Sequence, residues 1–259
     1  MYIFSCKPRW EDMLTCIYEA SASKRGHTNI KLVLEPIEQY SLLDHYIHVN
    51  ADLKKAECVM KSIREKISPQ VYRELAYASM TYEEEILDLI YRVLLVGFSY
   101  GPDVLNMVMY REIMQFNQIR RRLGREVNHF QEFVRFHEVQ KGLYVAHIEP
   151  KSRLVVALGP IFADRMPSEH FMIIDDIHKE ALIHPKDEMY YLKPLNDSEY
   201  EQLLKTEEMN DAYTDLWKIF FESIAIRERA NEKCQTNLFP LWTRKHAVEF
   251  MEMTKDNCK

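Results

Sequence analysis

The sequence contains few glycines and no glycine-rich or proline-rich stretch. Only 6 glycines and 10 prolines occur in 259 residues, and no segment repeats at a fixed period. A repeat architecture is therefore not predicted, and there is no obvious place for a flexible linker. We predict one continuous domain over residues 1–259.

Short motifs that mark many enzymes and cofactor sites are also missing. There is no G-x-x-x-x-G-K-[ST] phosphate loop, no G-x-G-x-x-G, no G-x-S-x-G and no H-E-x-x-H. No C-x-x-x-C-x-x-C trio is present for a radical-SAM iron–sulfur cluster. The five cysteines form no close pair, so neither a zinc site nor a disulfide framework is predicted. We predict no cofactor and no bound metal.

Long apolar runs are absent as well. No run approaches the roughly 20 residues of a membrane span. The N-terminal MYIFSCKPRW lacks the basic segment and apolar core of a secretion signal. The hydrophobic fraction of 47% is nevertheless ordinary for a packed globular protein. We expect a soluble cytoplasmic protein without a membrane partner.

The first half of the chain carries mostly helical patterns. Ser68 with Pro69 marks a helix start, and Thr81 with Glu84 forms a capping-box pattern before a helix that Gly97 is expected to end. Apolar spacing and β-branched runs predict helices at 10–22, 53–67 and after each of these two starts, and strands at 2–4 and 30–34.

The second half alternates strand-like and helical segments. The predicted elements are a hairpin from 133–139 and 143–148, a helix at 153–165, strands at 171–174, 181–184 and 189–192, and helices that begin at a capping box of Ser198 and Glu201. The fold class predicted is α+β, with a mostly helical first half and an antiparallel sheet in the second half covered by helices.

The stretch Ile113–Pro150 predicts one long helix that continues into the hairpin. One side of this helix is apolar and carries Ile113, Phe116, Ile119, Leu123, Val127 and Phe130. The other side is basic and polar and carries Arg111, Gln118, Arg121, Arg122, Arg125 and His129. This basic face suits a polyanion, and a nearby phosphate would favour charged His129. The alternative is a solvated surface whose charges pair with neighbouring acidic elements.

Charge is distributed unevenly around the net value of −6. Residues 111–153 contain 9 Lys/Arg and 5 Asp/Glu, which gives a net charge of +4. Residues 164–215 contain 5 Lys/Arg and 14 Asp/Glu, which gives a net charge of −9. The two regions could pair internally or serve different partners.

A second basic segment lies near the C-terminus. Residues 226–245 contain 5 Lys/Arg and 2 Asp/Glu, with amides and an aromatic ring interleaved. Such a mixture contacts phosphates, base edges and base faces. The candidate residues are Arg227, Arg229, Asn231, Gln235, Asn237 and Trp242. The alternative is an arm whose aromatic rings pack on the core.

Carboxylates and histidines give a metal-dependent alternative. Asp175 and Asp176 end a buried strand and could hold Mg²⁺, but adjacent strand residues point to opposite faces, so only one can enter a given site. His137 and His147 are expected to face each other across the hairpin without a third ligand at a sensible spacing. We therefore predict no metal site there.

The order of these segments resembles a bacterial family of proposed DNA metabolism proteins, a domain of unknown function. The matching stretches are WEDMLTCIYEA, REVNHFQEFVRFHE, GLYVAHIEP, FADRMPSEHFMIIDD and LWKIFFESIAIRERANEKCQTNLFPLW. The residues that recur in that family fall on His129, Phe130, Phe133, Arg135, Phe136, Phe162, Arg165, Asp175, Arg227 or Arg229, Asn231, Gln235, Pro240 and Trp242. One departure is His178, where the family often has an arginine.

The resemblance implies a role in DNA metabolism. In that family the gene typically lies beside one for a radical-SAM protein related to spore photoproduct lyase, and the domain is sometimes fused to a uracil-DNA-glycosylase-like domain. We therefore expect an accessory protein of DNA repair that binds nucleic acid and works with the radical-SAM protein, with Arg135 and Arg165 among its binding residues. The alternative is a metal-dependent enzyme, a nuclease or base-processing enzyme, that acts on DNA through Asp175 with His129 or His178.

Overall fold

The chain forms two compact units, Met1–Leu123 and Gly124–Lys259. The computed structural model describes residues 1–207, 216, 219, 233, 236, 239–244, 246 and 247. The boundary between the units falls inside α5 (Arg111–Phe133), which contributes to both. Whether the units act as one continuous domain stays a prediction.

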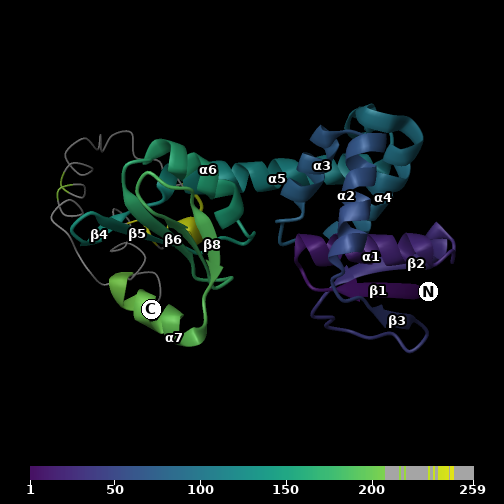
Figure 1. Ribbon diagram of the computed structural model, residues 1–259, viewed down its shortest axis with the longest axis horizontal. Helices are drawn as coiled ribbons and strands as arrows, with labels where there is room; N and C mark the ends of the chain where they lie inside the picture. Colours follow the sequence, from purple (N-terminus) through teal and green to yellow (C-terminus); the bar gives the residue numbers. More distant parts are fainter. Residues whose placement is uncertain are drawn as a thin grey trace. The chain divides into compact units, whose positions relative to one another are not determined.

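The first unit combines a small parallel sheet with helices, as shown in Figure 1. Its strands are β1 (Tyr2–Cys6), β2 (Ile30–Leu34) and β3 (His45–His48), and its helices are α1 (Trp10–Ala22), α2 (Leu53–Lys66), α3 (Pro69–Ala78) and α4 (Ile86–Tyr100), with the short η1 (His27–Asn29) and η2 (Gly101–Asn106). The strand order is β2-β1-β3, and both pairings are parallel. The sequence did not predict β3, because this four-residue edge strand buries neither end.

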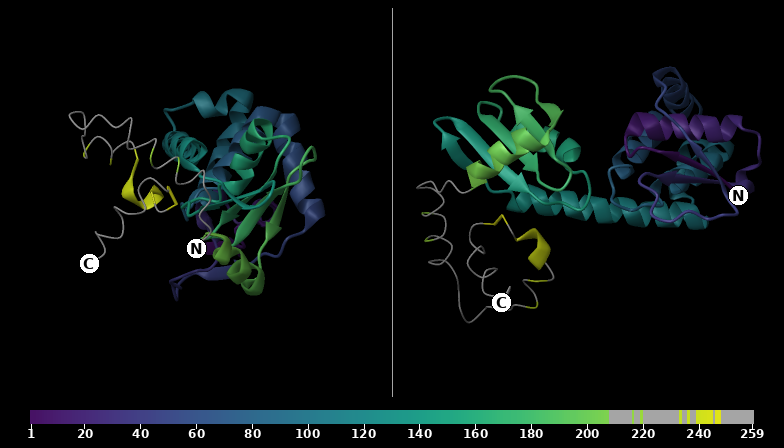
Figure 2. Two further views of the ribbon diagram at one scale, coloured as in Figure 1. Left: turned by 90° about the vertical axis from the view of Figure 1, so that its left-hand side faces the viewer. Right: turned by 90° about the horizontal axis from the view of Figure 1, so that it is seen from below.

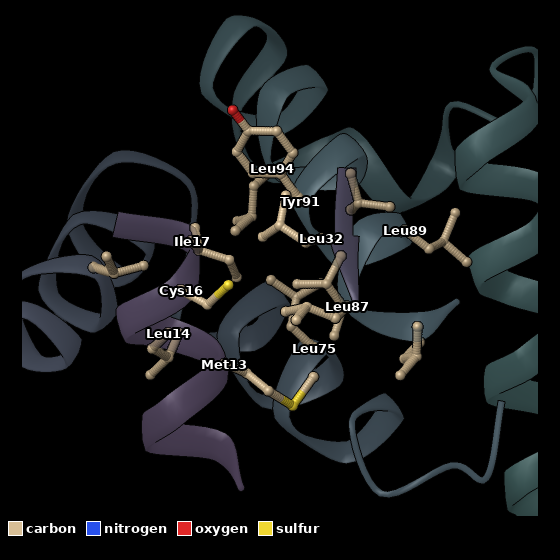
Figure 3. Close-up of a cluster of buried hydrophobic side chains, with 14 of the residues drawn as sticks. Met13, Leu14, Cys16, Ile17, Leu32, Leu75, Leu87, Leu89, Tyr91 and Leu94 are labelled. Atoms are coloured by element: carbon tan, nitrogen blue, oxygen red, sulfur yellow. The ribbon is translucent and has the colours of Figure 1, made fainter. Parts of the chain in front are cut away.

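The core of this unit lies between α1, the sheet and α4. Figure 3 shows Met13, Ile17, Leu32, Leu87 and Leu94 gathered in one cluster. Each is at most 4% exposed, and burying such a side chain contributes about 1.5–3 kcal/mol. The helical and strand periodicities therefore point their apolar faces at one another, as the spacing predicts.

Of the helix signals predicted in this unit, the start of α3 is confirmed, whereas the start and the end predicted for α4 are wrong. The side chain of Ser68 caps α3 by accepting a hydrogen bond from the backbone N–H of Val71, as predicted. The capping box predicted before α4 is wrong, because that helix begins after Glu85 without a side-chain cap. Gly97 lies inside α4, and Gly101, with φ of 78°, ends it. Only a residue without Cβ tolerates that backbone angle easily.

The second unit contains a five-stranded sheet. Its described elements are β4 (His137–Gln140), β5 (Leu143–Ile148), α6 (Val155–Arg165), β6 (His170–Asp175), β7 (Glu180–His184), β8 (Tyr191–Pro194), α7 (Asp197–Glu207) and η4 (Leu241–Thr243). The order is β4-β5-β6-β7-β8. The fold is α+β, but the sheet is mixed, because β5 and β6 run parallel. The prediction of a purely antiparallel sheet is wrong, since α6 returns the chain to the edge from which β5 started.

Helices cover this sheet only in part. α6 packs against β6 and β7, and α7 approaches β5. Figure 1 and Figure 2 show these two helices on opposite faces of the sheet. The cap of α7 lies two residues before the predicted one: Asn196 Oδ1 accepts from Glu199 N–H, and Glu199 Oε2 accepts from Asn196 N–H. Among the described helices, no single one is long and apolar enough to cross a membrane.

Gly159 in α6 allows the helix to approach the sheet closely. A Cβ built on this residue would lie 2.6 Å from Cε2 of Tyr190 and 2.8 Å from Cδ1 of Leu182. A Cβ at this position would force the Tyr190 ring and the end of the Leu182 side chain to shift from their packed positions.

We predict that Gly159→Ala lowers the free energy of unfolding by about 1–2 kcal/mol, because overpacking outweighs the helix propensity gained. Urea denaturation followed by circular dichroism measures the effect. Val156→Ala, at an exposed position of the same helix, should change stability by less than about 0.5 kcal/mol. A Gly159→Ala protein as stable as wild type would show that the packing is looser than described.

Candidate functional site

The basic face predicted on α5 is exposed, and part of it is neutralised. The exposed arginines are Arg111, Arg121, Arg122 and Arg125. An Nη1 atom of Arg122 lies 2.8 Å from Oε1 of Glu83. Arg111 and Arg122 also line a cleft of about 370 Å³ together with Glu83, Glu85 and Asp88. Pairing with acidic neighbours, the alternative drawn from the sequence, therefore applies to Arg122.

Arg135 and Arg165 both bind the C-terminal end of α5. The Arg135 guanidinium donates to the carbonyls of Glu132 and Val134 at 3.1 and 3.3 Å, and that of Arg165 donates to the carbonyl of Gln131 at 3.1 Å. Carbonyls in the last turn of a helix lack partners within it and carry partial negative charge. The two predicted binding residues therefore have a structural role at this helix end.

His129 packs in an aromatic cluster. Its ring centroid lies 4.9 Å from that of Phe133 and 5.1 Å from that of Phe239. Thr243 Oγ1 donates to the carbonyl of Pro240, so it accepts the hydrogen bond from His129 Nε2 at 2.7 Å. Burial lowers the pKa of His129. These contacts favour a neutral ring, not the charged ring expected beside a phosphate.

An exposed aromatic surface adjoins this cluster. The Trp242 ring packs against Phe130, with centroids 6.2 Å apart, yet 40% of Trp242 stays exposed. Lys151 Nζ lies 4.9 Å from the centroid of the Trp242 ring, and the neighbouring Leu241 is 55% exposed. We call Lys151, Leu241 and Trp242 the Trp242 surface. It presents a cation, an aliphatic side chain and an indole face side by side.

Acidic and histidine side chains meet where β5 and β6 end. Glu149 follows β5 and Asp176 follows β6, and the Asp176 N–H donates to the carbonyl of Ile148 at 3.0 Å. His246, beyond η4, places Nε2 at 3.6 Å from Glu149 Oε1 and 3.8 Å from Asp176 Oδ2. His147 Nδ1 lies 3.1 and 3.2 Å from the two Asp176 oxygens. We call Glu149, Asp176 and His246 the strand-end cluster.

The histidine pair predicted on the hairpin is offset. His137 pairs with Val145, not with His147, but the two imidazoles are stacked with centroids 6.5 Å apart and planes at 7°. The ring centroid of His246 lies 6.3 Å from that of His147. The sequence missed Glu149 and His246 as companions, because no motif spacing links residues so far apart in the chain.

Asp175 belongs to a turn. Its Oδ1 accepts from the backbone N–H groups of Ile177 and His178 at 3.0 Å each, and its Oδ2 lies 2.7 Å from Nδ1 of His178. The side chain is fully buried. Asp175 and Asp176 thus point to opposite faces, as strand alternation requires, and it is Asp176 that lies beside His147 and His246.

Arg227, Arg229, Asn231, Gln235 and Asn237 lie outside the described residues. Phe136 and Phe162, two residues that recur in the family the sequence resembles, form a second ring cluster with Phe171. Phe136 lies 5.4 Å from Phe162 and 5.7 Å from Phe171, between centroids. That cluster holds the start of the sheet to α6.

Comparison with known proteins places this α+β chain in a family without an assigned function. Residues 84–249 match the family described as a domain of unknown function, DUF4130. The match covers more than half of the chain, so the protein belongs to that family. No curated protein matches the chain.

The lowered pKa of His129 predicts a pH dependence. The unfolded ring takes up its proton near pH 6.5, whereas the folded ring does so only at lower pH. The contribution of His129 to stability is therefore complete above pH 6.5 and is lost as the pH falls through the folded pKa. His129→Gln, which keeps a donor for Thr243 without titrating, should lose less stability than wild type between pH 7.5 and pH 5.

Denaturant titrations at several pH values test this slope. His48→Gln is the matched control of opposite sign, because a hydrogen bond with Glu35 raises the pKa of His48, so its contribution is present at low pH and lost as pH rises. Identical pH slopes for wild type and His129→Gln would contradict the packing described for His129.

Proposed function

We propose that this protein is a nucleic-acid-binding accessory factor of DNA metabolism and repair in a bacterial cytoplasm, and that the Trp242 surface contacts the nucleic acid. The observation that carries the proposal is the exposed indole of Trp242 beneath Lys151 Nζ. An aromatic face next to a cation matches the two parts of a nucleotide, the base and the phosphate.

The geometry favours an unpaired base. An indole face stacks on a base only when that base has left the duplex stack or lies in a single strand. Lys151 would then neutralise the adjoining phosphate, and Leu241 would exclude water from the edge of the stacked pair. Stacking of this kind tolerates any base sequence.

The arginines of α5 divide into two groups under this proposal. Arg121 and Arg125 are exposed and remain candidates for phosphate contacts, with Arg111 at the start of the helix. Arg122 is a poor test residue, because Arg122→Glu would set a carboxylate beside Glu83 and would change stability before it changed binding.

We predict that Trp242→Leu weakens binding to single-stranded DNA by about tenfold, because stacking contributes about 1–3 kcal/mol per base. Lys151→Glu should also weaken binding and should lower the slope of log K against log salt by about 0.7, the value for one phosphate contact on a single strand. Fluorescence anisotropy of a labelled oligonucleotide at several salt concentrations measures both effects.

The matched control is Lys186→Glu, which makes the same charge change at an exposed position after β7 and should leave affinity and slope unchanged. Circular dichroism establishes that each variant is folded. Wild-type affinity for the single strand in a folded Trp242→Leu protein would contradict the proposed role of this surface.

The partner proposed for the factor is the radical-SAM protein related to spore photoproduct lyase. The support is the family resemblance, together with the acidic balance of −9 over residues 164–215. Within that segment Asp197 and Glu199 already pair with Lys179 and Lys193. The exposed Glu188 and Glu201 are better placed to meet a basic partner surface.

We predict co-elution of the two proteins in anaerobic size exclusion at micromolar concentration. The double variant Glu188→Lys and Glu201→Lys should weaken the complex by at least about fivefold, because like charges would then face each other. Lys186→Glu, which adds negative charge nearby, should not weaken it. Separate elution of the wild-type proteins, with and without DNA, would contradict the proposed partnership.

A further inference from the structure

We propose that the strand-end cluster of Glu149, Asp176 and His246 binds a divalent first-row transition-metal ion of the Mn²⁺ type. The topology brings the two carboxylates together. Because β5 and β6 are parallel neighbours, with Ile148 paired to Asp175, the residues that follow them emerge at the same edge of the sheet. His246 reaches this edge from the segment after η4.

The distances within the cluster fit ligands around one ion. His246 Nε2 lies 3.6 Å from Glu149 Oε1 and 3.8 Å from Asp176 Oδ2, and both separations are too long for hydrogen bonds. Atoms bound about 2.1 Å from a metal lie about 3.0–3.4 Å from one another. One donor atom from each residue falls within 4.8 Å of the other two, so small side-chain movements close the site.

The charge and the burial of the three side chains also favour binding of a cation. The side chains of Asp176, His246 and Glu149 are 5%, 13% and 23% exposed. Two carboxylates that lie close together attract a cation, and this attraction is stronger where water is partly excluded. The formal charge of the three ligands with neutral His246 is −2, which a divalent ion balances.

His147 is the positioning residue of this site. Its Nδ1 lies within hydrogen-bonding distance of both Asp176 oxygens, and its side chain is fully buried. Its place in β5 and its stacking on His137 fix the direction of that contact. Partners of this kind orient a ligating carboxylate and raise metal affinity.

The donor set indicates which ion fits. One imidazole nitrogen with two carboxylates favours Mn²⁺, Fe²⁺ or Zn²⁺ over Ca²⁺ and Mg²⁺, which prefer oxygen ligands alone. Three protein ligands leave coordination positions for water or substrate, as in catalytic metal sites. The sequence pointed to Asp175 as the metal-binding aspartate of a metal-dependent enzyme. The geometry assigns that role to Asp176.

Equilibrium binding of Mn²⁺ to the chelator-treated full chain tests the site without nucleic acid. Electron paramagnetic resonance counts the free ion during the titration. We expect one ion per chain, and at least about tenfold weaker binding for Glu149→Gln, Asp176→Asn and His246→Gln, each tested singly, because loss of even an orienting partner typically costs tenfold or more. Glu169→Gln, at an exposed carboxylate just before β6, should bind as wild type does.

Two results would overturn the proposal. One is a wild-type chain that binds neither Mn²⁺ nor Zn²⁺ with a defined stoichiometry, which would leave the cluster as a group of polar side chains around His246. The other is unchanged affinity in the folded single variants. Because no DNA enters the experiment, either failure leaves the proposed contact with nucleic acid untouched.

Discussion

Parallel pairing of β5 with β6 is the constraint on which the second unit depends. The crossover through α6 forces both strands to end at one edge, so Glu149 and Asp176 follow them side by side. The close approach of Gly159 to the sheet keeps this crossover tight. An antiparallel pairing, which the strand patterns alone predicted, would have put these carboxylates at opposite edges.

The segment around η4 completes the chemistry of this edge. Phe239 stacks on Phe133 with ring centroids 3.8 Å apart, and Thr243 binds His129. These contacts fasten the segment to the end of α5. The same segment then carries Trp242 and His246, so the aromatic surface and the strand-end cluster share one support.

Local signals predicted local structure well. The bounds of α1 and β2 follow from periodicity within the segments themselves, and Ser68 with Pro69 started α3 as expected. The end of α4 was predicted at the wrong glycine. Gly97 lies inside the helix, where it packs against Ile67, and Gly101, with its positive φ, ends the helix. The parallel direction of β5 and β6 was not predicted. It depends on the crossover between them, and the alternation of apolar and polar residues is the same in parallel and antiparallel strands.

The site was predictable only in part. The arginines of α5 were correctly expected at the surface, but the acidic neighbours of Arg122 lie on a different element. Strand alternation predicted that only one of Asp175 and Asp176 could enter a site, without telling which. Glu149 and His246 join Asp176 through tertiary structure alone, and their spacing matches no known ligand motif.

The most direct test of a single chemical site at this edge is a crystal structure of the protein with Mn²⁺, recorded at a wavelength where manganese scatters anomalously. The account predicts one anomalous peak within about 2.3 Å of donor atoms from Glu149, Asp176 and His246. A peak bound elsewhere, with Asp176 turned away from His246, would contradict the account.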